Sequence, residues 1–199
     1  MERTAVFIDY QNVHLGAHEQ FTTRGQPAYQ SLVDPLAVAE RIAAKRSRRF
    51  PSEVTQVRVF RGRPKRENQR TLAAANDAQT YAWERDPRVT VNRRDLKYSG
   101  WPALPPREKG VDVALAIDLV HTALREDYDV AVVFTNDADL LPAVELAFYE
   151  TKPRVEIAAW KGTKPLWFPA ELSEKRCLPF CHFLDAQDFA AVRDTRSYL

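Results

Sequence analysis

The chain has 199 residues, of which 45% are hydrophobic and 28% charged, and its 29 basic and 27 acidic side chains leave a formal net charge of +2. This composition excludes a disordered or fibrous chain, and two cysteines exclude a disulfide scaffold. The sequence has no signal-peptide pattern and no apolar run of the roughly 20 residues that a membrane helix needs. We therefore expect a cytoplasmic protein that does not enter a membrane.

The charge is unevenly distributed along the chain. Residues 41–110 carry 18 basic and 7 acidic side chains, whereas residues 111–150 carry 1 basic and 9 acidic ones. Such an asymmetry fits a surface for an anionic polymer beside an acidic site that holds cations. On charge alone, the more common explanation is that both stretches are solvated helix faces that neutralise each other in space.

Short apolar runs rich in Val, Ile and Phe alternate with longer helical patterns. The predicted strands are residues 4–9, 54–60, 88–92, 129–135, 154–160 and 180–184, and the predicted helices are residues 36–48, 67–85, 111–125 and 139–149. This alternation predicts an α/β fold in which a mostly parallel central sheet is covered by helices on both faces. Residues 16–31 and 95–110, which hold several glycines and prolines, are expected to be irregular loops.

The pattern of strands and helices continues without a break in composition. We therefore expect a single domain over residues 1–199, with its core in residues 4–160 and a C-terminal extension over residues 161–199.

Acidic residues follow two of the predicted strands. Asp9 closes the first strand, and Asp137 and Asp139 follow the strand that ends at Thr135. The carboxyl ends of parallel strands meet at one edge of a sheet, where open α/β sheets place their binding sites. Asp112 begins the helix after the second irregular loop, and it joins this group if that loop returns to the same edge.

Carboxylates that lie close together repel one another and stay ionised only beside a compensating cation. A site with oxygen ligands alone suits Mg²⁺ or Mn²⁺ and supports metal-assisted phosphoryl chemistry. The ordinary alternative is helix capping by Asp137 or Asp139 and a favourable helix dipole for Asp112. Asp118 lies six residues after Asp112, about 120° around a helix, so it ranks last among the candidate metal ligands.

Three motifs in this order resemble the NYN domain family, a branch of the PIN-like metal-dependent ribonucleases. They are residues 7–13 (FIDYQNV), 109–118 (KGVDVALAID) and 135–140 (TNDADL). The resemblance spans roughly residues 4–160 and implies a PIN-like three-layer α/β/α sandwich whose acidic cleft binds Mg²⁺ or Mn²⁺ and cleaves RNA. The family often has Ser-Gly-Asp where this chain has Thr135, Asn136 and Asp137.

The resemblance also implies roles for individual residues. Asp9, Asp112, Asp137 and Asp139 would form the metal-ligand set, and Asn12 would orient the site or the phosphate. The products implied are RNA fragments with 5′-phosphate and 3′-hydroxyl ends.

Basic side chains follow the second predicted strand, again at a carboxyl end. We expect Arg61, Arg63, Lys65 and Arg66, together with Lys109, to contact the phosphates of RNA. A solvated surface without a binding role is an equally good interpretation of the first four.

The sequence therefore predicts an endoribonuclease that depends on Mg²⁺ or Mn²⁺ and acts on single-stranded RNA. Two alternatives stay open, namely a non-catalytic RNA-binding or regulatory module of the same fold and another phosphotransfer enzyme with an acidic site. Besides RNA, the partners to consider are a protein inhibitor and a second copy of the chain.

Overall fold

The computed structural model describes residues 1–166 and 178–198. Its centre is a six-stranded sheet in the order β3-β2-β1-β4-β5-β6, in which each pairing is parallel. The strands are β1 (Glu2–Asp9), β2 (Ser52–Arg63), β3 (Val89–Asp95), β4 (Val130–Phe134), β5 (Arg154–Trp160) and β6 (Cys181–Leu184). The helices are α1 (Tyr10–Phe21), α2 (Pro35–Arg46), α3 (Arg70–Trp83), α4 (Val111–Leu124), α5 (Leu141–Glu150) and α7 (Ala186–Val192).

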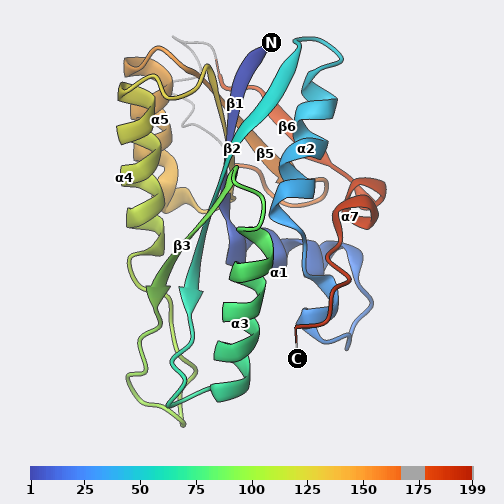
Figure 1. Ribbon diagram of the computed structural model, residues 1–199, viewed down its shortest axis with the longest axis vertical. Helices are drawn as coiled ribbons and strands as arrows, with labels where there is room; N and C mark the ends of the chain where they lie inside the picture. The colour runs from blue at the N-terminus through green and yellow to red at the C-terminus, as the bar shows by residue number, and fades with distance from the viewer. Residues whose placement is uncertain (167–177, 199) are drawn as a thin grey trace.

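Helices cover both faces of the sheet (Figure 1). Val6 and Ile8 of β1 belong to a core cluster with α1, α2, α3 and α7, whereas Ala5 and Phe7 belong to a second cluster with α4 and α5. All five residues of β4 are buried, as expected of a strand covered on both sides. The predicted α/β fold with three layers is therefore confirmed.

The chain reverses its direction of winding next to β1. From β1 it runs through α1, α2 and α3 on one face to add β2 and β3, and α4 then crosses the other face to β4. β1 and β4 are therefore neighbours whose following helices, α1 and α5, pack on opposite faces. In open parallel sheets, such a reversal opens a crevice at the carboxyl ends of the two strands.

The six predicted strands and four predicted helices are found, but three segments differ from the prediction. Residues 16–21 belong to α1 and not to an irregular loop; half of the residues of this helix are polar and it buries only Tyr10, Val13 and Ala17, which leaves a weak hydrophobic period. β2 continues three residues past its predicted end, because it pairs with β3 as far as Arg63. Neither α1 nor α7 was predicted as a helix.

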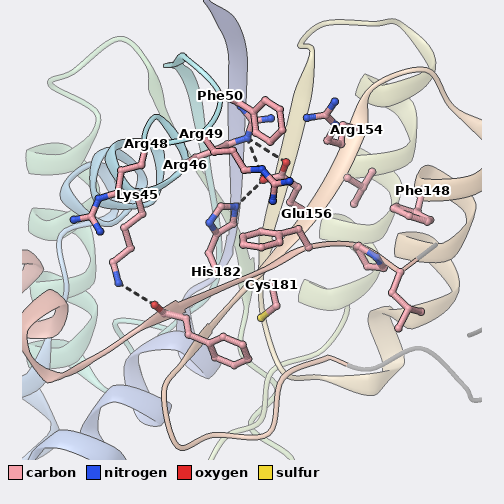
Figure 2. A pocket seen from close by; sticks show the side chains of 15 residues that line it. Lys45, Arg46, Arg48, Arg49, Phe50, Phe148, Arg154, Glu156, Cys181 and His182 are labelled. Carbon is pink, nitrogen blue, oxygen red and sulfur yellow. Dashed lines mark hydrogen bonds and ion pairs between the residues drawn. The ribbon is translucent and has the colours of Figure 1, made fainter.

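A buried network of ion pairs joins α2 to β5 and β6 (Figure 2). The Nε of Arg46 donates to both carboxylate oxygens of Glu156 at 3.1 Å, and its Nη1 donates to Glu2 at 2.6 Å. The Nε2 of His182 lies 2.6 Å from Glu156 Oε2. Burial raises the pKa of Glu156, but His182 and Arg46 outweigh it and hold this pKa below its ordinary value. The network borders a cavity of about 620 Å³ at the amino ends of β5 and β6.

The segment after β5 contributes to the same sheet and core. β6 pairs with β5, and α7 packs into the cluster that covers β1. Beyond α7, the buried carboxylate of Asp194 accepts hydrogen bonds from Trp83 Nε1 at 3.1 Å, Tyr198 Oη at 2.6 Å and Arg196 Nη2 at 2.7 Å. We therefore expect residues 161–199 to unfold together with residues 4–160, as one domain.

Replacing Asp194 by Asn tests this anchor. Burial raises the pKa of Asp194, but the bonds from Arg196, Tyr198 and Trp83 outweigh it and hold the pKa at about 2, below its ordinary value of 3.8. A pKa lowered by folding stabilises the protein above the unfolded-state pKa, and this contribution is lost as the pH falls through about 2. Asp194→Asn should lower the free energy of unfolding by roughly 2 kcal/mol at neutral pH, and by progressively less below about pH 4, in chemical denaturation.

Glu53→Gln, at an exposed acid of β2, is the matched control and should change the free energy of unfolding by less than about 0.5 kcal/mol. An effect of Asp194→Asn that is the same at neutral and acidic pH would contradict the role of its charge. A separate unfolding transition for the C-terminal segment would contradict the single domain.

Candidate metal centre

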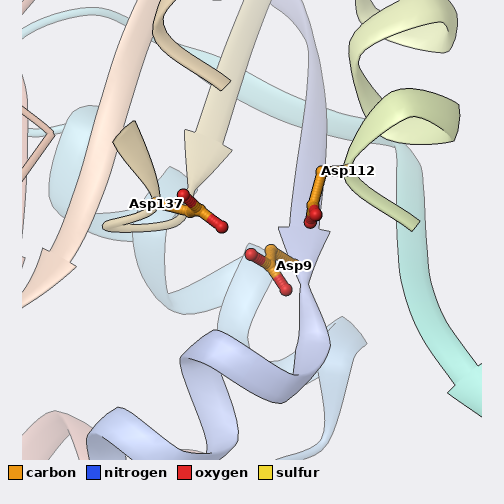
Figure 3. Close-up of side chains that lie close together, drawn as sticks. All are labelled: Asp9, Asp112 and Asp137. Atoms are coloured by element: carbon orange, nitrogen blue, oxygen red, sulfur yellow. The ribbon is translucent and has the colours of Figure 1, made fainter. Parts of the chain in front are cut away.

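Three carboxylates meet at the crevice between β1 and β4 (Figure 3). Asp9 is the last residue of β1, Asp137 follows β4, and Asp112 lies in the first turn of α4. Each residue offers an oxygen atom that lies within 4.8 Å of the other two. The structure therefore brings together three of the predicted metal ligands from three separate elements.

Asp9 is fixed in orientation by hydrogen bonds from both sides of the crevice. Its side chain is almost fully buried; Oδ2 accepts from Thr135 Oγ1 at 3.0 Å, and Oδ1 accepts from the backbone N–H of Asn12 at 3.4 Å. Thr135 Oγ1 in turn accepts from the backbone N–H of Asp137 at 3.0 Å. One threonine hydroxyl thus links two of the three carboxylate residues. Asp9 is also the N-cap residue of α1, because its side chain accepts the hydrogen bond from the backbone N–H of Asn12.

The loop after β4 is tied to α1 by the side chain of Asn12, whose Oδ1 accepts from the backbone N–H of Asn136 at 3.2 Å. Asn136 stands where the NYN family often has glycine. The backbone does not require glycine there, because Glu126 is the only non-glycine residue with a positive φ in the described part of the chain.

Asp112 is positioned by the turn that begins α4. Gly110 precedes the helix with φ of +77°, a left-handed conformation that glycine adopts without strain. The chain can therefore leave the preceding loop and enter α4 with Asp112 in its first turn, directed at the crevice (Figure 3).

Among the described residues that line the cavity of about 400 Å³ around these carboxylates, no side chain is cationic. Burial raises the pKa of Asp9 to about 7, with smaller contributions from the charges of Asp112 and Glu108, although the bonds from Thr135 and Asn12 act in the opposite direction. Burial and the charge of Asp137 also raise the pKa of Asp112. Oxygen ligands with uncompensated charge fit a divalent cation such as Mg²⁺ or Mn²⁺.

Glu108 adds a further carboxylate to the cavity, and it was missed in the sequence. Its Oε1 accepts from the backbone N–H of Gly62 at 2.6 Å, and the amide nitrogen of Gln11, turned toward it, lies 2.8 Å from the same oxygen. Burial and the charge of Asp112 raise the pKa of Glu108. The residue lies in an irregular loop without periodicity, so its position next to the motif at 109–118 is its only sequence signal.

Two other predicted ligands lie outside the cluster of three. Asp139 is exposed; its backbone N–H donates to Asp137 Oδ1 at 3.0 Å, and its charge contributes to the raised pKa of Asp112. Asp118 instead accepts from Arg58 Nη1 at 2.8 and 2.7 Å, so this carboxylate already has a cationic partner.

The cations predicted to contact RNA lie in two kinds of environment. Arg63, Lys65 and Arg66 are exposed and pair with surface carboxylates at 2.8 to 3.8 Å. Exposed pairs of this kind are weak and exchange readily for other partners. Lys109 is also exposed, whereas Arg61 is half-buried against aromatic rings.

A doubly wound parallel sheet with carboxylates at its point of reversal defines an α/β protein with an acidic site. The sequence model of the NYN domain matches residues 3–168, so the chain belongs to the NYN domain family, a PIN-like family whose members are generally nucleases that use divalent metals and bind RNA.

The chain is similar to the crystal structure of a protein of unknown function from Vibrio parahaemolyticus, with 18% identity and a TM-score of 0.47 over 79% of this chain and 81% of that one. The search of curated proteins gave no match. Within residues 1–166 and 178–198, no helix is both long and apolar enough to cross a membrane.

Replacing Asp112 by Asn tests the metal centre without RNA. Removing one of three mutually repelling charges should leave the metal-free protein at least as stable as the wild type. A cation that binds only the folded state raises the melting temperature. We expect Mn²⁺ to raise the melting temperature of the wild type above its value in EDTA, and to have little effect on Asp112→Asn.

Asp118→Asn is the control on the same helix. It removes the partner of Arg58 and should lower stability modestly, but it should keep the full response to Mn²⁺. A response of Asp112→Asn equal to that of the wild type would refute metal binding by this carboxylate.

Proposed function

We propose that the protein is a metal-dependent endoribonuclease that hydrolyses the phosphodiester bonds of single-stranded RNA in the acidic cleft. The observation that carries this proposal is the convergence of Asp9, Asp112 and Asp137 in a cavity with no lysine or arginine among its described lining residues. Membership of the NYN domain family supports the same reaction class.

We assign Asp9, Asp112 and Asp137 as the ligands of Mg²⁺ or Mn²⁺, with Asp139 at the rim of the cleft. When bound, the ion supplies positive charge for the scissile phosphate and lowers the pKa of the attacking water. Thr135 and the backbone N–H of Asn12 keep the Asp9 carboxylate in one orientation. The Asn12 side chain is a positioning group, because it holds the loop after β4 against α1.

RNA must approach a cleft that is itself negative, so cations near the cleft have to offset the repulsion. The hydrogen bond from Gly62 to Glu108 joins the end of β2 to the loop before α4, next to the acidic residues. Arg63 is the next residue after Gly62 in the sequence, and Lys109 is the next residue after Glu108. These two cations, together with Lys65 and Arg66, are proposed to guide the RNA backbone.

Asp9→Asn should abolish cleavage while preserving the fold. The change removes one ligand charge, and we expect the rate of cleavage of end-labelled single-stranded RNA in Mn²⁺ to fall by more than about a hundredfold. Asp118→Asn should cleave at a rate close to that of the wild type. Thermal unfolding of each variant verifies the fold, and the labelled products should carry 5′-phosphate and 3′-hydroxyl ends.

The wild-type protein distinguishes the alternatives in the same assay. RNA binding without cleavage in either Mg²⁺ or Mn²⁺ would identify a non-catalytic module. Hydrolysis of a small phosphate ester without RNA binding would identify a different phosphotransfer enzyme. Cleavage by Asp9→Asn at the wild-type rate would show that Asp9 is not a catalytic metal ligand.

If these cations guide RNA, the affinity for RNA should depend on salt concentration, and replacing the cations should make that dependence weaker. In EDTA, the affinity for single-stranded RNA should fall steeply with salt, because bound phosphates release counterions. Replacing both Arg63 and Lys109 by Gln should weaken binding and lower the slope of log affinity against log salt by about one for each lost phosphate contact. Arg48→Gln, beyond α2 at the opposite edge of the sheet, should leave the slope unchanged. A salt-independent affinity in the wild type would overturn this mode of binding.

A further inference from the structure

Arg61 occupies an unusual environment at the end of β2. It follows Phe60, which pairs with Asp9 across the sheet. The central carbon of its guanidinium lies 4.8 Å from the ring centroid of Tyr10 and 5.1 Å from that of Trp83. Its Nη1 donates to Gln79 Oε1 at 2.8 Å. The two rings and the amide therefore hold this cation in a fixed orientation.

This fixed cation has no ion-pair partner among the described residues. Neighbouring arginines do have one: Arg58 pairs with Asp118 at 2.7 Å, and Arg93 pairs with Asp77 at 2.6 Å. Burial lowers the pKa of the Arg61 guanidinium, and the smaller effects of Tyr10, Glu108 and Tyr198 do not outweigh this burial and the charge of Arg93. A desolvated cation without a counter-charge is strongly unfavourable unless an anion compensates it.

The N–H groups that Arg61 leaves free are accessible. A guanidinium has five N–H donors, and Arg61 uses one of them in a hydrogen bond to the described residues. None of its nitrogen atoms is among the described side-chain atoms that are buried without a hydrogen-bond partner, in contrast to Nη2 of Arg46. Arg61 lines a cavity of about 430 Å³ into which a ligand can reach these donors.

This cavity adjoins the acidic cleft. The two cavities share Gln11, Leu15 and Glu108 as lining residues, so a strand of nucleic acid can occupy both. The second cavity is lined by two arginines, Arg61 and Arg107, and Glu108 is its single carboxylate. The Glu108 carboxylate is engaged by the backbone N–H of Gly62 and by Gln11.

His14 also lines this cavity, but it does not add a charge. Its Nε2 lies 2.7 Å from the backbone carbonyl of Ala28, and burial lowers the pKa of the ring. The cationic groups that face a ligand are therefore Arg61 inside the cavity and the exposed Arg107 at its edge.

We infer that this cavity is a phosphate-binding subsite, in which Arg61 and Arg107 hold an RNA phosphate next to the one that is cleaved in the acidic cleft. A planar guanidinium binds two phosphate oxygens at once, which fixes the register of the strand as well as its charge. The inference rests on the proposed function. It adds that the Arg61 guanidinium sets the distance along the strand between the bound phosphate and the phosphodiester bond that is cleaved. The phosphate is either internal or the 5′-terminal one.

Arg61→Met separates this role from a structural one. Methionine fills much of the same space between the rings without the charge, and although Gln79 Oε1 loses its donor, thermal unfolding should show that the variant folds. Binding of a short single-stranded RNA in EDTA should weaken about ten- to a hundredfold. Arg61→Lys keeps the charge but loses the planar donor group, so its affinity for the RNA should lie between those of the wild type and Arg61→Met. Arg48→Met is the control and should bind as the wild type does.

Two RNAs of the same sequence, with a 5′-phosphate or a 5′-hydroxyl end, identify the phosphate. A loss of affinity in Arg61→Met confined to the phosphorylated RNA assigns the terminal phosphate, and an equal loss with both assigns an internal one. Unchanged affinity for both RNAs would overturn the subsite.

A third measurement is independent of the proposed function. At constant ionic strength, inorganic phosphate in place of chloride should raise the melting temperature of the wild type, and it should not raise that of Arg61→Met. This result would support the subsite even if the wild type neither bound nor cleaved RNA, which would overturn the nuclease proposal alone. An equal response of the two proteins to phosphate, or no response of either, would overturn the subsite.

Discussion

The reversal of winding between β1 and β4 is the constraint on which the acidic cleft depends. Because α1 and α5 leave these strands toward opposite faces, no helix covers the carboxyl ends of the strands, and Asp9 and Asp137 share that opening. The change in the pKa of Asp9 from 3.8 to about 7 corresponds to roughly 4 kcal/mol of lost preference for the charged form. A cation bound in the cleft, as proposed, would offset this cost.

Local patterns were sufficient to predict the sheet and most of the cleft, but they missed residues that depend on long-range packing. Apolar runs marked the strands, and parallel order then placed Asp9 and Asp137 at one edge. The helix α1 was not predicted, because it buries only Tyr10, Val13 and Ala17 and exposes the apolar Leu15, so its hydrophobic period is weak. Glu108 joins the cleft through a hydrogen bond to Gly62, 46 residues away in sequence, which no local pattern records. The half-buried position of Arg61 likewise depends on packing against Trp83 of α3 and against Tyr10 of α1, which is distant in sequence.

The uneven charge of the chain has two explanations in the fold, and each accounts for part of it. Much of the basic segment is neutralised by ion pairs, as at Arg46, Arg58 and Arg93. The carboxylates of the cleft and the guanidinium of Arg61 are not neutralised in this way by the described residues. These groups line two adjoining cavities, one acidic and one with two arginines, a pattern that suits a strand of phosphates and a divalent cation better than it suits a neutral ligand.

Trp83 connects the C-terminal residues to this arrangement. Its indole N–H donates to Asp194 at 3.1 Å, while its ring packs against the guanidinium of Arg61. The same carboxylate of Asp194 also accepts hydrogen bonds from Arg196 and Tyr198. The orientation of a cavity-lining cation is thus set in part by residues more than 130 positions further along the chain. A change confined to residues 194–198, remote in sequence from each acidic motif, would reach Arg61 through the indole ring of Trp83 and through the electrostatic effect of Tyr198.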